Sequence, residues 1–219
     1  MMYVSQRVIA VPKRTTWQKW VASFYVFMAL FIAMPAQASS QVEAANRLID
    51  AMVKDVESYL LSDSGDISER TKNITKLLDT HFDIPGIARF SAGPYWRAAN
   101  EEERVTYTQS MRKALIGTIS RNFDQLVGLR FTIIDSSAKG SKMVLVRGTF
   151  GDKAGKRPPV SVGWRVVTPH LAPAKVLDVE IENISMLVTQ KQENIAIIRK
   201  NGGRFSALIE AMSQRQKTQ

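Results

Sequence analysis

His81 and His170 are the only imidazoles in the 219-residue chain, so they are the first candidates for acid–base chemistry. Each stands beside residues typical of turns, and a general base also needs an orienting partner and a substrate within reach. The nearest acidic partners in the sequence are Asp79 and Asp83, on either side of His81. A surface or hydrogen-bonding role is therefore favoured for both histidines. The alternative is an enzyme acting on an apolar substrate through His81 with Asp79 or Asp83.

Two further patterns resemble chemical sites but do not complete them. Asp178, Glu180 and Glu182 alternate along one segment, as expected of the solvent-facing side of a strand. Residues 151–156, GDKAGK, resemble a phosphate-binding loop, yet they lack its spacing and its following helix and are typical of a hairpin turn. The sequence also lacks HExxH and His/Asp clusters with metal-ligand spacing. We therefore predict no catalytic residue, no metal and no cofactor, and a protein that binds rather than reacts.

The sequence contains no cysteine. This excludes disulfides, thiolate metal sites, a cysteine nucleophile and the lipid-modified amino terminus of bacterial lipoproteins. The fold must therefore be held by its apolar core, which a chain of this size is able to bury without covalent cross-links.

Residues 1–38 have the pattern of a cleavable signal peptide. Four basic residues and no acid accompany an apolar run at 21–34, and Ala36-Gln37-Ala38 matches a small-x-small cleavage site. The apolar run has 14 residues, fewer than the roughly 20 that span a bilayer as a helix, so cleavage is favoured over an uncleaved anchor. We expect residues 39–219 to form one mature domain in the periplasm.

The chain carries a formal net charge of +10, and removing the four basic residues of the leader leaves +6 for residues 39–219. Such a surplus favours encounter with anionic surfaces, for example lipid head groups or an acidic partner protein. Basic residues are not interleaved with aromatic ones, and the chain is exported, so nucleic acid is not an expected partner. We expect a monomer.

Apolar spacing predicts amphipathic helices over residues 41–61, 67–78, 101–127, 186–199 and 205–212, with short helical turns between 81 and 96. Asn100 followed by Glu103 predicts a capping box at the start of the longest helix. Four strands are predicted at 131–135, 142–150, 160–168 and 176–184. The order of helices, sheet and helices predicts a single α+β domain in which helices cover one face of a curved four-stranded antiparallel sheet.

Alternation along the last two strands predicts which side of the sheet is apolar. Val160, Val162, Trp164 and Val166 share one face, and Leu177, Val179 and Ile181 are expected to join them. The helices then cover this dry side. The pattern leaves open whether the space between the layers is filled by side chains or forms a hollow for a ligand. A filled core would suit an adaptor that only docks other envelope proteins.

Two stretches resemble the MlaC family, also called the toluene-tolerance family. The first runs from Phe82-Asp83 through Gly93-Pro94-Tyr95-Trp96-Arg97 to Glu103-Arg104, and the second is the strand-to-helix passage from Asp178 to Met186. Lys191-Gln192 and Arg199 to Gly202 continue the likeness, which covers roughly residues 42–212. Asn183 stands where the family usually has glycine, and asparagine tolerates the left-handed turn better than most residues.

The resemblance implies a periplasmic lipid carrier that hydrolyses nothing. Members of the family carry a phospholipid between an outer-membrane lipoprotein complex and an inner-membrane ABC transporter with its MCE-domain protein. The family fold is a helix-covered antiparallel sheet with acyl chains in an apolar cavity between the layers. A branch of the family is associated with hopanoids, so a carrier or accessory protein for a hopanoid or another apolar lipid is the alternative.

With this resemblance, Tyr95 and Trp96 are expected at the mouth of the cavity, because each ring has an apolar body and a polar edge. The alternative is that they pin the short helices onto the sheet. Arg97 and Arg165 are the candidates for contact with a lipid head group. The cavity wall is expected to include Ile87, Leu115, Ile119, Phe123, Val162, Trp164, Val166, Val179 and Ile181.

Overall fold

The computed structural model describes residues 35–152 and 154–218. Most of the predicted leader, residues 1–34, lies outside the described residues, and residues 39–219 form one compact unit. The first described helix, α2, runs over Pro35–Ser62. None of the helices in the described ranges is both long enough and apolar enough to cross a membrane.

The remaining helices agree in place with the predicted ones. They are α3 (Ile67–His81), α4 (Ile84–Ser91), the 3-10 helix η1 (Gly93–Arg97), α5 (Glu101–Asn122), the 3-10 helix η2 (Phe123–Leu126), α6 (Met186–Lys200) and α7 (Ser206–Thr218). The capping box is confirmed, because the Asn100 side chain accepts from the Glu103 amide and the Glu103 carboxylate accepts from the Asn100 amide. Side chains of Asp66, Asp83 and Ser185 cap α3, α4 and α6.

The sheet is an antiparallel meander of five strands rather than the predicted four. In order they are β1 (Leu129–Ala138), β2 (Met143–Asp152), β3 (Val160–Val167), β4 (Lys175–Ile181) and β5 (Ile184–Ser185). The extra strand forms because Glu182 and Asn183 both have positive φ, 48° and 64°, and turn the chain back so that Ile184 pairs with Ile181.

Strand register confirms the predicted apolar side, with one correction. Trp164 pairs with Val146 on β2 and with Val179 on β4, so these three side chains share a face. A bulge in β4 brings Val176, rather than Leu177, onto this face. We call it the dry face. Its apolar members on β2, β3 and β4 are Val144, Val146, Phe150, Val160, Val162, Trp164, Val166, Val176, Val179 and Ile181.

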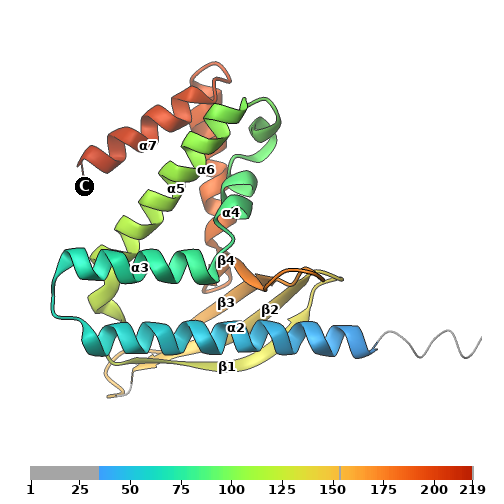
Figure 1. Cartoon of the computed structure of the whole chain (residues 1–219), viewed down its shortest axis with the longest axis vertical. Helices are drawn as coiled ribbons and strands as arrows, with labels where there is room; N and C mark the ends of the chain where they lie inside the picture. Colours follow the sequence, from blue (N-terminus) through green and yellow to red (C-terminus); the bar gives the residue numbers. More distant parts are fainter. Residues whose placement is uncertain (1–34, 153, 219) are drawn as a thin grey trace, which may run out of the picture. The chain divides into compact units, whose positions relative to one another are not determined.

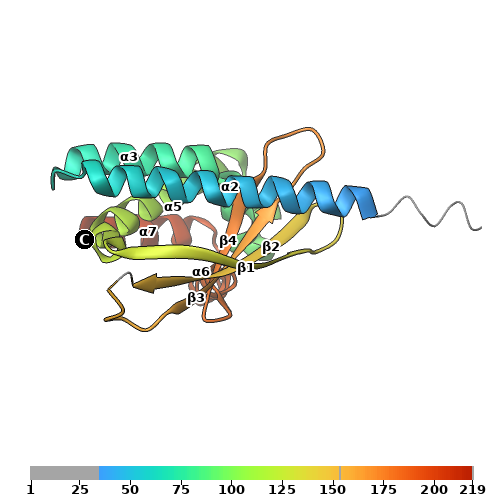
Figure 2. The same cartoon turned by 90° about the horizontal axis from the view of Figure 1, so that it is seen from below.

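Helices α2 and α3 lie side by side across the sheet, while α4 to α7 stand together beyond its β4 edge (Figures 1 and 2). Two polar contacts fix the first half of α2: Gln41 donates from Nε2 to the Ser141 carbonyl, and the Ser136 hydroxyl donates to Asn46 at 2.7 Å. Phe82, just after α3, forms a parallel bridge with Val176. The bridge and β5 together cover the otherwise unpaired edge of β4.

A buried hydrogen-bond network centred on Tyr107 of α5 joins three of these helices. The Tyr107 hydroxyl lies 2.7 Å from the Ser91 hydroxyl of α4 and 2.7 Å from Nδ2 of Asn194 on α6. Asn194 also donates to the Ser91 carbonyl. The Tyr107 ring packs edge-on against Phe205. Burial raises the pKa of Tyr107 to about 12, so the hydroxyl stays protonated and the network needs no charge.

We expect Asn183→Val to lower the free energy of unfolding by about 1–2 kcal/mol, because a β-branched residue is strained at positive φ. Asn183→Gly should change it by less than about 0.5 kcal/mol, since glycine adopts this conformation freely. Urea denaturation of the two variants measures the difference. Equal stability of both would show that the tight β4–β5 turn is not needed by the fold.

We expect Tyr107→Phe to lower the free energy of unfolding by about 1–3 kcal/mol at pH 7, because Ser91 and Asn194 lose a buried partner. The unfolded tyrosine ionises near pH 10, whereas the folded one stays protonated up to about pH 12. Wild-type stability therefore falls with rising pH in this window, by up to about 1.4 kcal/mol per unit, and the variant lacks this component. Urea denaturation between pH 7 and 11.5 measures both effects.

The control for this experiment is Tyr59→Phe, because the side-chain hydroxyl of the half-buried Tyr59 has no hydrogen-bond partner among the described residues. If Tyr59→Phe and Tyr107→Phe lose equal stability with the same pH profile, the network does not hold the three helices together.

Candidate functional site

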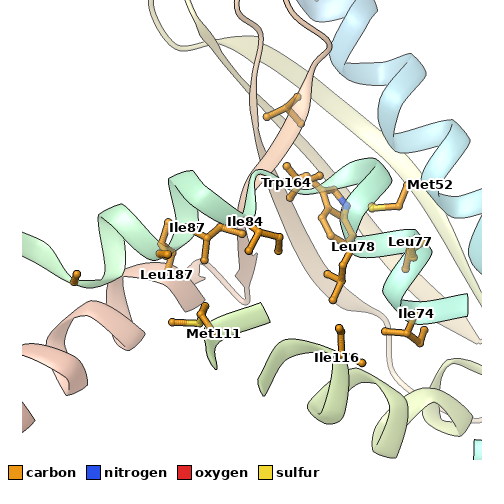
Figure 3. Packing of buried hydrophobic residues seen from close by; sticks show 14 of the residues in the cluster. Met52, Ile74, Leu77, Leu78, Ile84, Ile87, Met111, Ile116, Trp164 and Leu187 are labelled. Carbon is orange, nitrogen blue, oxygen red and sulfur yellow. The ribbon is translucent and has the colours of Figure 1, made fainter. Parts of the chain in front are cut away.

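Apolar side chains from four elements pack together between the dry face and the helices. Met52 of α2 and Leu78 of α3 lie beside Trp164 of β3, and Ile116 of α5 points toward Leu78 (Figure 3). All four are buried. We call this apolar layer the apolar interlayer. Its lining is the environment in which a hydrocarbon chain would exchange water for apolar contacts.

Burial of the dry face changes along the strands. Val166 and Val176, at the end that carries the β3–β4 loop, have no exposed surface. At the other end, exposure rises to 38% for Val160, 41% for Ile181 and 59% for Ile184. Ile181 pairs with both Val162 and Ile184, so this exposed apolar surface is continuous with the buried part of the face. We call this end of the sheet the open end.

Some apolar residues of the helical layer are also incompletely covered. Leu115 and Ile119 of α5 are half-buried and pack against the core, whereas the neighbouring Phe123 of η2 is fully buried. Leu61 and Ile67 stand exposed on the α2–α3 connection, which lies at the same end of the sheet as the start of β1 (Figures 1 and 2). The helical layer therefore leaves apolar surface in contact with water at this end.

Arg70 of α3 fixes the position of the helices at the open end. Its guanidinium contacts the carboxylates of Asp63 at 2.5 Å and Asp124 at 2.9 Å, and lies over the Phe123 ring. Through the hydrogen bond to Asp63, Arg70 holds the pKa of that carboxyl below its usual range. The α2–α3 connection and η2 are thereby tied to one another, so the apolar rim is built on fixed elements.

Aromatic rings define the shape of the dry face near the open end. Phe131 of β1 packs against Phe150 of β2 at 5.0 Å and meets Trp164 edge-on at 5.9 Å between ring centroids. Gly148 makes this arrangement possible, because a Cβ at that position would lie 2.5 Å from the Phe131 ring and 2.3 Å from the Thr132 carbonyl. Pattern reasoning had no signal for Phe131 or Gly148, because the contact depends on the β1–β2 register.

The structure groups most of the predicted cavity residues but not all of them. Val162, Trp164, Val166, Val179 and Ile181 share the dry face. Leu115 and Ile119 lie on α5 and pack against the core, and Phe123 of η2 belongs to it. Ile87 is buried on α4 beside Leu187 of α6 (Figure 3), outside the group around Trp164. Contact of any of these residues with a ligand stays a prediction.

Tyr95 and Trp96 lie on η1 and are half-buried. Arg104 of α5 donates to the Trp96 and Arg97 carbonyls at 3.0 and 3.2 Å, and its guanidinium lies 5.6 Å from the Trp96 ring centroid. This arrangement attaches η1 to α5, and it gives Arg104 a structural role beside the aromatic pair. The predicted role at a cavity mouth stays a prediction.

The two predicted head-group arginines lie in different surroundings. Arg97 is exposed on η1, whereas Arg165 points to the side of the sheet opposite Trp164. There Arg165 contacts the carboxylates of Asp178, at 3.4 Å, and Glu180. The prediction that this acidic strand face is solvated was wrong, because Asp178 and Glu180 are buried. A head-group role for either arginine stays a prediction.

Asp178 also holds together the strand-to-helix passage from Asp178 to Met186. Its carboxylate accepts from the Ser185 hydroxyl and from the Leu187 amide, at 2.5 and 2.9 Å. Ser185 in turn caps α6 by accepting from the Val188 amide. Asp178 and Ser185 therefore fasten the start of α6 to β4, and these acids have a structural role.

The histidine dyads considered from the sequence do not form. Asp79 pairs with Arg112 at 2.6 Å, and the Asp83 carboxylate accepts from the Gly86 amide as the cap of α4. His81 is buried and its Nε2 lies 2.7 Å from Asp55 of α2. No local sequence pattern indicates this pair, because 26 residues separate the partners. Within the described ranges, no group of three or more acidic or histidine side chains is placed to hold a metal ion.

A model of the MlaC protein family matches residues 46–214 of this chain. The chain belongs to the MlaC family. Its fold is similar to that of a phospholipid-binding protein from Ralstonia solanacearum, solved in complex with a phospholipid, with a TM-score of 0.66 and 19% sequence identity. The match covers 81% of this chain and 97% of the Ralstonia chain. A comparison with curated protein sequences finds no match.

Membership in the MlaC family agrees with the element order given above. The family model spans the helices, the whole sheet and most of α7, so the open end and the apolar interlayer both belong to the matched region. At 19% identity the Ralstonia structure confirms the α+β fold with its antiparallel sheet. It does not transfer individual ligand contacts.

We expect His81→Ala to lower the free energy of unfolding by about 1–3 kcal/mol, because it removes a buried ring and its bond to Asp55. Asp79→Ala is the matched control: it removes a partly exposed ion pair and should cost less than about 1 kcal/mol. Neither variant should change the amount of lipid extracted from the purified protein. Release of lysolipid from phospholipid by the wild type, abolished in His81→Ala, would instead support the enzyme alternative.

Proposed function

We propose that this protein is a periplasmic phospholipid carrier that holds acyl chain in the apolar interlayer and exchanges it through the open end. The observation that carries the proposal is the gradient of burial along the dry face, from fully covered at Val166 and Val176 to exposed at Ile181 and Ile184. Family membership and the likeness to a structure solved with a phospholipid support it. Binding of an acyl chain would need only an apolar site that opens to solvent at one end.

The free energy of burying an acyl chain favours a lipid that exchanges between carrier and bilayer over one that stays permanently bound. Burial of one methylene group is worth about 0.8 kcal/mol, so a chain of roughly 15 carbons gains on the order of 10 kcal/mol on leaving water. A lipid in a bilayer has already made a similar gain. Transfer between bilayer and carrier is therefore close to balanced, and the protein does not need to do chemistry to load or unload.

Direction must then come from partners. We propose that the carrier docks with an outer-membrane lipoprotein complex and with the MCE-domain protein of an inner-membrane ABC transporter, as the family resemblance implies. Residues 39–219 carry a net charge of +6, which favours encounter with acidic partner surfaces and anionic lipid head groups. The signal-peptide pattern of residues 1–38 supports a periplasmic location. We propose a binding protein and not an enzyme.

The proposal is tested by native mass spectrometry and organic extraction of the protein purified from the periplasm. We expect about one phospholipid per chain. Ile119→Glu should reduce occupancy at least tenfold, because it places a charge beside the acyl chain. Thr118→Glu, at the exposed neighbouring position of α5, is the matched control and should keep wild-type occupancy.

Ile119→Trp provides a second variant that keeps the site apolar while filling it, in case the charge of Ile119→Glu weakens the fold. It should also lower occupancy. Full occupancy in both Ile119 variants would show that the acyl chain does not lie in the apolar interlayer. Recovery of a hopanoid instead of a phospholipid would favour the alternative ligand, and absence of any lipid after gentle purification would exclude a carrier.

A further inference from the structure

Trp164 carries a buried hydrogen-bond donor that has no acceptor. Its side chain is 9% exposed, and its Nε1 has no hydrogen-bond partner among the described residues. The indole lies beside Met52 and Leu78 (Figure 3) and forms a T-shaped ring pair with Phe131. None of these side chains offers an oxygen. The polar atom of Trp164 therefore lies in the apolar interlayer, beside the proposed path of a lipid chain.

The missing acceptor is significant because buried tryptophans normally find one. Leaving a buried donor unpaired costs about 1–3 kcal/mol, whereas phenylalanine would fill much of the same volume without that cost. The backbone cannot supply the acceptor, since Trp164 is a central-strand residue paired with Val146 on one side and Val179 on the other. The carbonyls of these strands point along the sheet and are used by the strand ladder.

Two other unpaired polar atoms in the described ranges lie away from this position. Ser137 of β1 is opposite Leu145, on the sheet face away from Trp164, and His81 lies at the end of α3. Among the dry-face residues named on β2, β3 and β4, Trp164 is the one with a polar side-chain atom. Its donor is thus placed where a ligand in the apolar interlayer would reach it.

We propose that the Trp164 Nε1–H donates a hydrogen bond to an oxygen of the bound lipid, and that the site thereby selects lipids that place an acceptor oxygen inside the apolar interlayer. The oxygen belongs to an ester carbonyl or to a hydroxyl group. A lipid whose buried part is hydrocarbon only leaves the donor unpaired. This inference rests on the proposed function, and it makes Trp164 a specificity-determining residue.

The strand geometry sets where that oxygen must lie. Trp164 is four residues along β3 from Val160, which stands at the open end. At about 3.3 Å per residue the donor lies roughly 13 Å inside the rim. An ester carbonyl reaches this depth when the glycerol part of the lipid is drawn inward, and a chain hydroxyl reaches it when the head group stays at the rim.

The test measures selectivity by competition binding. The probes are a phosphatidylethanolamine with ester-linked chains, its ether-linked counterpart, stearic acid and 10-hydroxystearic acid. We expect the wild type to prefer the ester over the ether, or the hydroxy acid over stearic acid, by about fivefold to tenfold. The first preference identifies an ester carbonyl as the acceptor, and the second identifies a chain hydroxyl. In Trp164→Phe the preferred ratio should fall to about one.

Tyr107→Phe is the matched control, because it removes a buried donor from the helical network and not from the apolar interlayer. It should keep the wild-type selectivity ratio despite its lower stability. A nuclear magnetic resonance readout is independent of affinity: the indole N–H signal that is missing in Trp164→Phe should move downfield when the preferred lipid binds, and not with its acceptor-free counterpart.

The inference is overturned if both pairs of probes bind the wild type equally, or if the indole signal is already downfield without lipid, which would identify water as the acceptor. It is also overturned if Trp164→Phe retains the selectivity. In each of these cases lipid still binds, so the carrier proposal stands. Failure of the wild type to bind any of the four probes would instead contradict the proposed function.

Discussion

The structure depends on the need to cover the dry face of a five-stranded sheet. Antiparallel pairing places one row of valines on a single side, and those at the β3–β4 loop end are fully removed from water. Helices α2 and α3 lie across this side, but apolar surface remains exposed at the open end. A domain of this size is able to bury such a face completely, so the incomplete cover is the feature that needs a functional explanation.

Polar contacts hold the helices in place without using the apolar interlayer. The Tyr107 network fastens α4, α5 and α6, and Asp178 with Ser185 fastens α6 to β4. Arg70 ties α3 to η2 at the open end. Because these contacts use none of the side chains that surround Trp164, they do not depend on what packs against the dry face. The side chains that hold the helices in place are thus different from those that surround Trp164. Such an arrangement suits a binding site that releases its ligand without unfolding.

Local patterns in the sequence predicted what local physics determines. The capping box at Asn100, the helix order and the apolar side of β3 all follow from short-range spacing, and all are confirmed. The predictions that were wrong concern contacts between residues that are distant in the sequence. The bulge that replaces Leu177 by Val176 and the pairing of His81 with Asp55 have no local signal. The burial of Asp178 was missed because its partners Arg165, Ser185 and Leu187 lie on β3, β5 and α6, outside the strand whose alternation was used.

In the candidate site too, local pattern predicted the position of residues but not their contacts. Alternation placed Trp164 and Val179 on one face, yet it could not show that the indole nitrogen would lack a partner, because that depends on every neighbour at once. An acyl chain is stabilised by any apolar environment that excludes water and fits its shape. The bilayer from which the lipid comes provides such an environment too. Preference among lipids must therefore come from the few polar groups within reach of the buried part, since hydrocarbon contacts alone distinguish chains weakly. In the apolar interlayer the Trp164 N–H is such a group, and its unpaired state without ligand makes a lipid with a matching oxygen the better occupant.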